Sequence, residues 1–472
     1  MKVSIVGAGT AGLITALILK IRFRTLEIEI IKSDKIGIIG VGEGTTEHWK
    51  QFADFCDIPY QELIKKTGAT LKYGIMFEDW TDHTYFHNII GQVESVKFGQ
   101  YQAGYIYSII NNLTPKQYTS DFCFQNKIAT DSIANQLHFN TFKLNDFLLK
   151  KCQAIGINVI EDEITDLKFN DFGNISCLFS KNNKYKSDFY IDCTGFKRLL
   201  IGKLGAKWIS YSKYLPMNEA IAFPTGDTKE YTPYTLAKAM TSGWMWRIPT
   251  QGRWGNGYVF NNNYINAEQA KKECEDYLGY EVHIGKNIKF EAGALDRAWI
   301  KNCVAVGLSS SFIEPLEASS IGTTIQQAFI LIHKIINYKK SDIDSYNVSF
   351  NRIVENIRDF VVLHYITNKK DSAFWKELKI NLPESLSNNL KKWKTKAPMV
   401  TDFPEDYSLF KEANFIVLLK ELNLIDKDSI AKEFNSLSQN LKDTVKQKID
   451  RVREWNVTGD IIDHKTYLKK LQ

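Results

Sequence analysis

Three glycines near the start of the chain have the spacing of a nucleotide-binding turn. Gly7, Gly9 and Gly12 lie between a β-branched run at 3–6 and an apolar helical pattern at 13–19. In this pattern the first glycine permits a tight turn, the second lets a pyrophosphate approach the backbone, and the third lets helix and strand pack closely. The residues predicted to contact a dinucleotide here are Gly7, Gly9, Thr10, Ala11 and Gly12. A glycine-rich turn in another α/β fold is the alternative.

The acidic residue that usually binds the ribose after the second strand is missing. The β-rich run 26–31 is followed by Lys32-Ser33-Asp34, so Ser33, Asp34 or a backbone group must take over this contact. Two later strand ends also carry small residues. They are Asp192-Cys193-Thr194-Gly195 and Val304-Ala305-Val306-Gly307-Leu308. Together the three strand ends predict FAD held across a discontinuous domain, because NAD alone normally needs one such region.

Ionisable side chains occur in two otherwise apolar or small-residue stretches. Lys72 is the only basic residue of the β-like segment 67–76, and burying a lysine is costly unless its charge is paired or lost. Glu314 and Glu317 precede an apolar helix at 321–332, where the helix dipole alone favours carboxylates. From the residues alone, an exposed lysine on an edge strand and dipole-stabilised glutamates are the alternative interpretation.

The histidines give no convincing metal site. His83 and His87 have a spacing that places two ligands on one helix face, but the residues between them are β-branched and aromatic. Chance spacing explains this pair. His138, His333 and His364 lie in apolar stretches that favour helices, where we expect them to be packed and hydrogen-bonded.

Composition excludes several classes of protein. The 472 residues are 44% hydrophobic and 24% charged, which indicates a globular chain, and a net charge of +6 does not indicate nucleic-acid binding. The seven cysteines include no CxxC pair, which argues against a zinc ribbon and a disulfide framework. There is no signal-peptide pattern and no apolar run of membrane-spanning length. We therefore expect a soluble protein of the cytoplasm, with no membrane or nucleic-acid partner.

The pattern of strands and helices predicts an α/β fold with added antiparallel sheet. Helices are expected at 50–66 and 131–157, antiparallel strands at 159–169, 175–180 and 184–191, a strand pair at 244–248 and 254–260, and mostly helices from about 323 onward. No Gly/Ser-rich or Pro-rich linker separates these parts. The only boundary we predict lies near residue 330.

Four further segments carry a family resemblance. They are Gly40-Val41-Gly42-Glu43-Gly44-Thr45-Thr46, Gly243-Trp244-Met245-Trp246-Arg247-Ile248-Pro249, Phe312-Ile313-Glu314-Pro315-Leu316-Glu317-Ala318-Ser319-Ser320-Ile321, and Leu363-His364-Tyr365 followed by Asp371-Ser372 and Phe374-Trp375. In this order, beside the flavin fingerprint, they resemble the flavin-dependent halogenases, in particular the tryptophan-halogenase-like branch. The Trp-x-Trp-x-Ile-Pro pattern is the most specific of them, and the resemblance runs from residue 1 to about 380.

The resemblance implies a fold and a reaction. Residues 1–330 would form a discontinuous, Rossmann-like FAD-binding domain with an inserted substrate-side sheet, and residues 331–472 a mostly helical region that contributes to the substrate pocket. Reduced FAD (FADH2), supplied by a separate flavin reductase, would react with oxygen and a halide ion to give hypohalous acid. The acid would travel through a tunnel to Lys72, and Glu317 would assist the reaction at the substrate.

The resemblance also implies the binding residues. The implied cofactor contacts beyond the fingerprint are Ser33, Val41, Gly44, Leu308 and Ile321. Ser319 and Ser320 correspond to the halide-binding Thr-Gly pair of the family. The missing glycine changes the local backbone, so bromide and iodide are candidate halides in addition to chloride. Trp244 and Trp246 share one strand face and serve as a family signature rather than as catalytic residues.

Two other functions stay open on the sequence. A single-component flavin monooxygenase or reductase of the same fold would consume NADPH by itself. A non-enzymatic flavin-fold protein would hold FAD and turn over no substrate. Residues 380–472 do not reproduce the tryptophan-binding region of the family, so we expect a different electron-rich aromatic or heteroaromatic substrate. The sequence sets no oligomeric state and leaves a homo-oligomer open.

Overall fold

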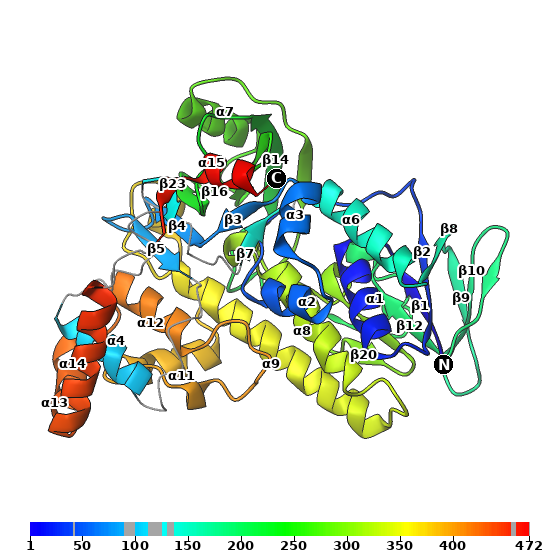
Figure 1. Cartoon of the computed structure of the whole chain (residues 1–472). Helices are drawn as coiled ribbons and strands as arrows, with labels where there is room; N and C mark the ends of the chain where they lie inside the picture. Colours follow the sequence, from blue (N-terminus) through cyan, green and yellow to red (C-terminus); the bar gives the residue numbers. More distant parts are fainter. Residues whose placement is uncertain (41–42, 89–99, 112–124, 130–135, 455–458, 472) are drawn as a thin grey trace. The chain divides into compact units, whose positions relative to one another are not determined.

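The computed structural model describes residues 1–40, 43–88, 100–111, 125–129, 136–454 and 459–471 (Figure 1). The chain divides into two compact units, and each is assembled from three separated stretches. Unit 1 consists of Met1–Ala69, Phe139–Ser212 and Phe290–Ile357, and unit 2 of Thr70–His138, Lys213–Lys289 and Arg358–Gln472. The boundary predicted near residue 330 falls inside helix α8 (Ser319–Ile332) and coincides with none of these division points.

Unit 1 is built on a six-stranded sheet in the order β20-β21-β12-β1-β2-β8. Its strands are β1 (Lys2–Val6), β2 (Glu27–Lys32), β8 (Asn158–Glu161), β12 (Phe189–Asp192), β20 (Trp299–Ile300) and β21 (Cys303–Ala305). All neighbours pair in parallel except the edge pair of β20 and β21. This parallel arrangement confirms the predicted α/β fold with a βαβ unit at its N-terminus.

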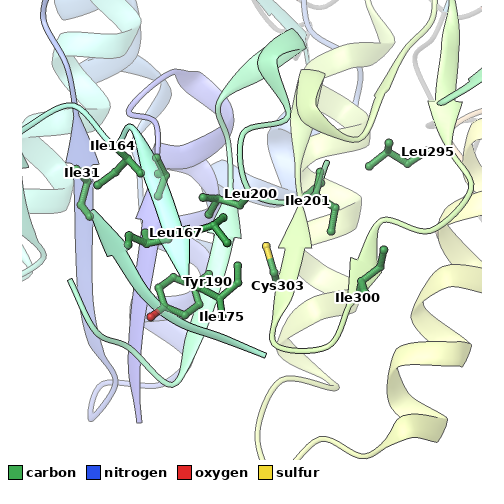
Figure 2. Packing of buried hydrophobic residues seen from close by; sticks show 13 residues of the cluster. Ile31, Ile164, Leu167, Ile175, Tyr190, Leu200, Ile201, Leu295, Ile300 and Cys303 are labelled. Carbon is green, nitrogen blue, oxygen red and sulfur yellow. The ribbon is translucent and has the colours of Figure 1, made fainter. Parts of the chain in front are cut away.

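One apolar cluster covers a face of this sheet (Figure 2). Side chains from the sheet, among them Ile31 and Tyr190, meet Leu167 and Ile175 of the strands β9 (Asp166–Phe169) and β10 (Ile175–Phe179). Leu200, which follows the short helix η1 (Gly195–Lys197), joins the same cluster. Burial of such side chains is worth about 1.5–3 kcal/mol each, so this core fixes the loop that follows β12.

Helix α1 (Thr10–Arg22) of unit 1 packs against both α6 (Thr141–Ala154) and α8. The remaining elements of the unit are α2 (His48–Phe55), α3 (Tyr60–Thr67), η2 (Gly307–Ser309), η3 (Pro315–Glu317), β11 (Lys184–Tyr185), β13 (Trp208–Ser210), β19 (Gly293–Leu295) and β22 (Ser311–Phe312). Helix α9 (Lys340–His364) begins in unit 1 and ends in unit 2.

Two predicted helices are corrected by the structure. The helix expected at 50–66 is two helices, because Asp57 adopts a positive φ of 51° and α3 restarts after Pro59. Of the helix expected at 131–157, only α6 is found. Asn140 caps α6 by accepting the backbone N–H groups of Phe142 and Lys143. Residues 136–138 form a strand, and 131–135 lie outside the described residues.

The predicted antiparallel strands at 159–191 are only partly correct. β9, β10 and β11 do form an antiparallel sheet. In contrast, β8 and β12 join the parallel sheet, where they pair with β2 and β1. The β12 residues are buried throughout, as expected of a parallel strand with both faces covered. The sequence of β12 therefore has no alternation of apolar and polar residues that would mark it as half-exposed or fully buried.

Unit 2 contains a seven-stranded sheet in the order β18-β14-β17-β16-β15-β4-β5. Its strands are β4 (Gly74–Glu78), β5 (Tyr85–Asn88), β14 (Glu219–Gly226), β15 (Thr235–Met240), β16 (Gly243–Thr250), β17 (Arg253–Phe260) and β18 (Lys286–Lys289). β16 and β17 pair antiparallel across a two-residue turn, which confirms the predicted strand pair. Helix α7 (Ala267–Leu278) packs on this sheet, with Ala270 and Cys274 against Ile221 and Tyr258.

The remaining parts of unit 2 are two small sheets and a set of helices. The strands are β3 (Thr70–Lys72) with β7 (Gln136–His138), and β6 (Lys127–Ala129) with β23 (Ile461–Asp463). The helices are α4 (Gln100–Ile110), α10 (Ala373–Glu377), α11 (Glu384–Trp393), η4 (Val400–Asp402), α12 (Glu412–Glu421), α13 (Lys427–Asn435), α14 (Gln439–Glu454) and α15 (His464–Lys470). Helix α4 packs against both α13 and α14 (Figure 1). None of the helices that the structure describes is long and apolar enough to cross a membrane.

Candidate active site

The glycine turn of unit 1 has the geometry that the sequence predicts. Gly7 has a φ of 109° and donates its N–H to Ile31 O at 2.8 Å, which ties the end of β1 to β2. A Cβ at Gly7 would lie 2.3 Å from Cys193 O, and a Cβ at Gly12 would lie 2.1 Å from Gly7 O. Both positions therefore require glycine because the backbone approaches too closely for a side chain.

Gly9 differs from the other two glycines. An added Cβ there would meet no protein atom within 4 Å, so the space beside its Cα is open. Gly9 is the N-cap of α1, has an ordinary φ of −69°, and forms no side-chain cap. Thr10 and Ala11 are half-exposed beside it. An unfilled space in front of a helix N-terminus fits the pyrophosphate of a dinucleotide.

The three strand ends predicted to approach the cofactor lie in adjacent strands, because β12 pairs with β1 and with β21. Asp192, at the end of β12, is fully buried and accepts the N–H groups of Thr194, Leu200 and Ile201. A Cβ at Gly307, just after β21, would lie 2.5 Å from the Ala11 side chain. Asp192 thus orders the loop after β12, and Gly307 lets the third strand end reach α1.

At the expected ribose position, the acidic side chain is engaged elsewhere. Lys32, the last residue of β2, forms ion pairs with Asp34 and, at 2.9 Å, with Glu161 of β8. These contacts lower the pKa of the Asp34 carboxyl, chiefly through the hydrogen bond from Lys32. Ser33 is half-buried between them. The ribose contact stays a prediction, with Ser33, Asp34 or a backbone group as the alternatives.

The remaining predicted cofactor contacts are distributed around the same unit. Val41 lies outside the described residues. Gly44 is buried in a segment whose Glu43 O accepts the N–H of Phe139 at 2.8 Å. Leu308 is half-buried in η2, and Ile321 is buried in the first turn of α8.

The predicted halide residues line a small cavity at the start of α8. The cavity measures about 10 Å³, roughly the space that one water molecule needs. Its lining residues are Gly307, Ser311, Phe312, Ile313, Ser319, Ser320 and Thr323. Ala318 precedes them with a positive φ of 51°, a conformation that costs a non-glycine residue energy. A helix N-terminus with a small adjoining cavity suits a small anion.

Glu317 and Lys72 are both completely buried, but they belong to different units. Glu317 ends η3, directly before Ala318, and Glu314 is buried beside it. Lys72 ends β3, opposite Gln136 of β7. The interpretation of Lys72 as an exposed residue on an edge strand is therefore wrong. The expected approach of Glu317 to the ammonium group of Lys72 stays a prediction.

The strand that carries Lys72 is held by hydrogen bonds from several directions. The Thr70 hydroxyl donates to Pro249 O at 2.7 Å, and Tyr73 N–H donates to Pro233 O at 2.9 Å. Pro249 is the last residue of the Trp-x-Trp-x-Ile-Pro segment. This segment therefore has a structural role beyond its two tryptophans, because its carbonyl fixes the start of the lysine strand.

Buried histidines surround the same strand. His138 lies opposite Thr70, with its Nδ1 at 3.2 Å from the Thr70 hydroxyl and its Nε2 at 2.8 Å from the Thr235 hydroxyl. Burial, followed by the charge of Lys72, holds the pKa of His138 well below its usual value. The prediction of a helix at His138 is wrong, but the prediction that this histidine is packed and hydrogen-bonded is confirmed.

The tryptophans of the motif form part of the core of unit 2. Trp244 and Trp246 have ring centroids 6.2 Å apart, as expected of alternate residues on one strand face. The Trp246 ring lies over Gly257, where a Cβ would come within 2.1 Å of it. This close packing explains why β17 has glycine at that position.

The other histidine predictions concern metal binding and packing. His83 is exposed and contacts Asp82 and Glu421, while His87 is buried in β5. His364, at the end of α9, is buried and stacks on Phe77. His333 is exposed at the end of α8, so the prediction that it is packed is wrong. In the part of the chain that the structure describes, no cluster of His, Cys, Asp and Glu has the arrangement of a metal site.

Sequence reasoning missed the residues that hold the lysine strand. His464 accepts the Leu71 N–H at its Nε2, at 3.0 Å, from the far C-terminal end of the chain. Thr70 and Thr235 were likewise not singled out. A buried polar residue next to the candidate lysine was a usable signal for Thr70, but no local pattern connects residue 71 with residue 464.

Comparison with known proteins identifies the family. The sequence profile of the tryptophan halogenase family matches residues 2–433. Tryptophan 6-halogenase SttH of Streptomyces toxytricini is 29% identical over 92% of this chain and 94% of its own. Tryptophan 6-halogenase ThaL of Streptomyces albogriseolus is 30% identical over 88% of this chain and 86% of its own.

Solved structures agree with the sequence comparison. The crystal structure of SttH covers 99% of both chains with a TM-score of 0.84 at 27% identity. Xcc4156, a flavin-dependent halogenase from Xanthomonas campestris, covers 100% of this chain and 98% of its own with a TM-score of 0.83 at 27% identity. The similarity extends past residue 380, where the motifs had predicted its end. The chain therefore belongs to the tryptophan halogenase family and is a flavin-dependent halogenase.

Proposed function

We propose that this enzyme uses reduced FAD, oxygen and a halide ion to make hypohalous acid, and that Lys72 directs the acid to an electron-rich aromatic substrate. The observation that carries the proposal is the placement of Lys72. Its side chain is completely buried, on a three-residue strand held by neighbouring elements. Complete burial of a lysine is costly and therefore rare, so this position favours a functional lysine.

FAD, when bound, would supply the activation of oxygen. Residues of unit 1 would hold it. The open space at Gly9 would take the pyrophosphate at the N-terminus of α1, and Ser33 would contact the ribose. Val41, Gly44, Leu308 and Ile321 stay the predicted contacts of the rest of the cofactor. The turn at Gly7 and Gly12 has no room for side chains, which fits a backbone cradle for a dinucleotide.

The halide would bind at the start of α8. Backbone N–H groups of Ser319 and Ser320 are the predicted donors, beside the small cavity that these residues line. Serine in place of the family's glycine is the departure that makes bromide or iodide a candidate beside chloride.

Lys72 and Glu317 would have separate tasks. The ammonium group of Lys72 would donate a hydrogen bond to hypohalous acid and hold it toward the substrate ring. The Glu317 carboxylate would orient the lysine or accept the proton that the ring releases. Exclusion of water by the buried surroundings would keep the oxidant from other reactions.

The partners follow from the same proposal. A separate flavin reductase would supply reduced flavin, in line with a single Gly-x-Gly-x-x-Gly fingerprint in the chain. The relatives SttH and ThaL are named tryptophan 6-halogenases, which favours an indole or a similar electron-rich heteroaromatic ring as the substrate class. A cytoplasmic location stays a prediction.

The decisive experiment compares product formation with oxygen consumption. The full-length enzyme is given reduced FAD, oxygen, each halide in turn, and a panel of indoles and phenols that includes tryptophan, and products are detected by mass spectrometry. Lys72→Ala should still bind FAD and consume oxygen, while halogenated product falls about 10²- to 10⁴-fold.

Lys66→Ala serves as the matched control, because Lys66 is exposed and forms an ion pair with Glu62 on its own helix. It should leave product yield unchanged. Near-normal product from Lys72→Ala on every substrate would overturn the proposed role of Lys72. Rapid NADPH oxidation by the chain alone would instead support a single-component flavin monooxygenase.

A further inference from the structure

The short strand that carries Lys72 is paired on one side by another strand. β3 has three residues, and β7 is its one strand partner among the residues that the structure describes. Two-stranded sheets of this size are at best marginally stable by themselves. The N–H of Leu71 faces away from β7, because it donates to His464 Nε2 at 3.0 Å. His464 therefore closes the edge of β3 one residue before the candidate lysine.

His464 is presented by a segment that is anchored independently of this hydrogen bond. β23 pairs with β6, with Asp463 opposite Lys127. Asp463 then caps α15 by accepting the N–H of Thr466 at 2.9 Å. Lys465 donates to Asp227 at 2.6 Å. Replacement of the imidazole alone should thus leave the C-terminal segment in place.

The imidazole has the protonation state that this contact needs. Only a neutral histidine has a ring nitrogen that can accept a hydrogen bond. Burial lowers the pKa of His464 to about 4, partly offset by backbone groups of Thr232 and Tyr231. The ionisable groups that act on it or lie beside it are Asp463 on its own segment, the Tyr231 ring and His138 of β7, and Lys72 of β3 acts in turn on His138. Near neutral pH the ring therefore stays uncharged and able to accept.

We propose that His464 is a positioning residue for Lys72: by accepting the Leu71 N–H it fixes β3 so that the lysine side chain meets the oxidant in one orientation. This inference rests on the proposed role of Lys72. Leu71 is buried, so loss of the acceptor leaves its N–H without a partner, a cost that the strand can avoid only by moving. A displacement of about 1 Å at a reacting group can reduce a rate on the order of 10²-fold.

The test compares variants at position 464 of similar size. His464→Leu fills the space but cannot accept a hydrogen bond, whereas His464→Gln keeps an acceptor. The full-length enzyme is assayed with reduced FAD, oxygen and the best halide and substrate from the panel. Halogenated product per oxygen consumed is recorded together with FAD affinity and melting temperature.

The expected result is a loss of coupling without a loss of flavin binding. His464→Leu should lower product per oxygen at least about 10-fold, with FAD affinity unchanged, and His464→Gln should restore most of it. Lys469→Ala, an exposed control in the same helix, should behave as wild type. In a Lys72→Ala background, His464→Leu should have no further effect, because the two changes act on one group.

Three outcomes would overturn the proposal. Wild-type coupling in a folded His464→Leu variant would remove the positioning role while leaving Lys72 untouched. A full additional loss in the Lys72→Ala background would show that His464 acts elsewhere. If His464→Leu does not fold, His464→Asn replaces it. The asparagine side chain is polar but too short to reach the Leu71 N–H. Wild-type coupling in His464→Asn would also overturn the proposal. A failure of the proposed function would be seen in a different variant, because Lys72→Ala alone would then form normal amounts of halogenated product.

Discussion

Replacing Gly9 by alanine should separate flavin binding from folding. An added Cβ at Gly9 meets no protein atom within 4 Å, and the φ of −69° is ordinary for alanine. Alanine is a poorer N-cap than glycine, but it also reduces the entropy of the unfolded chain. These effects oppose each other, so we expect the free energy of unfolding to change by less than about 1 kcal/mol.

The same methyl group should exclude the pyrophosphate from the helix N-terminus. Hydrogen bonds to a charged group are worth about 1.5–3 kcal/mol. Loss of one such contact corresponds to a decrease in FAD affinity of about 10- to 150-fold, since 1.4 kcal/mol is a factor of ten. Titration of the protein with FAD, followed by flavin fluorescence, measures this change, and calorimetric melting of the cofactor-free protein measures stability.

Gly12→Ala is the matched comparison. Its Cβ would lie 2.1 Å from Gly7 O, so the backbone must shift, at a cost of about 1–3 kcal/mol. This variant should lose both stability and FAD affinity, whereas Gly9→Ala should lose affinity alone. Unchanged FAD affinity in Gly9→Ala would refute the assignment of the open space to the pyrophosphate.

Three other results are expected. The pKa of His464 is about 4 in the folded protein and near 6.5 in the unfolded chain, so its contribution to stability is present above pH 6.5 and is lost as the pH falls toward 4. The free energy of unfolding should therefore fall between pH 7 and pH 5 by about 2 kcal/mol less in His464→Gln than in the wild type, measured by urea unfolding. An equal fall in both proteins would contradict the lowered pKa. Gly257→Ala should destabilise unit 2 by about 1–3 kcal/mol, read from the urea midpoint, because its Cβ would come within 2.1 Å of the Trp246 ring; an unchanged midpoint would show that β16 and β17 pack differently. Ser320→Gly should raise chloride use relative to bromide at unchanged FAD affinity, measured by competition between the two halides, and an unaltered product ratio would argue against a halide site at Ser320.

Local patterns predicted the flavin-binding turn well. The glycines at 7, 9 and 12 act through the backbone of one turn, so their spacing alone contains most of the information. The strand ends at Asp192 and Ala305 were also predicted, because in each case an apolar run is followed by small residues. Lys72 was found through the family resemblance, since a single lysine in a short strand has no distinctive spacing.

The elements that failed were those decided by distant parts of the chain. Residues 136–138 have apolar spacing compatible with a helix, yet they form a strand because β3 lies beside them. β8 and β12 were expected to be antiparallel to their chain neighbours, but pairing with β2 and β1 was the decisive interaction. His464 contacts Leu71 across nearly the whole length of the sequence.

The threading of the chain through both units has a consequence for its synthesis. β1 is synthesised well before its neighbour β12, which is complete only after Asp192 has been made. Unit 1 is complete only once the stretch Phe290–Ile357 has emerged. Unit 2 waits still longer, until β23 can pair with β6. Long-range pairing of this kind folds slowly and exposes unpaired strands meanwhile. Nascent chains should therefore depend on chaperones, and a product that stops near residue 330 should aggregate rather than survive as a flavin-binding fragment.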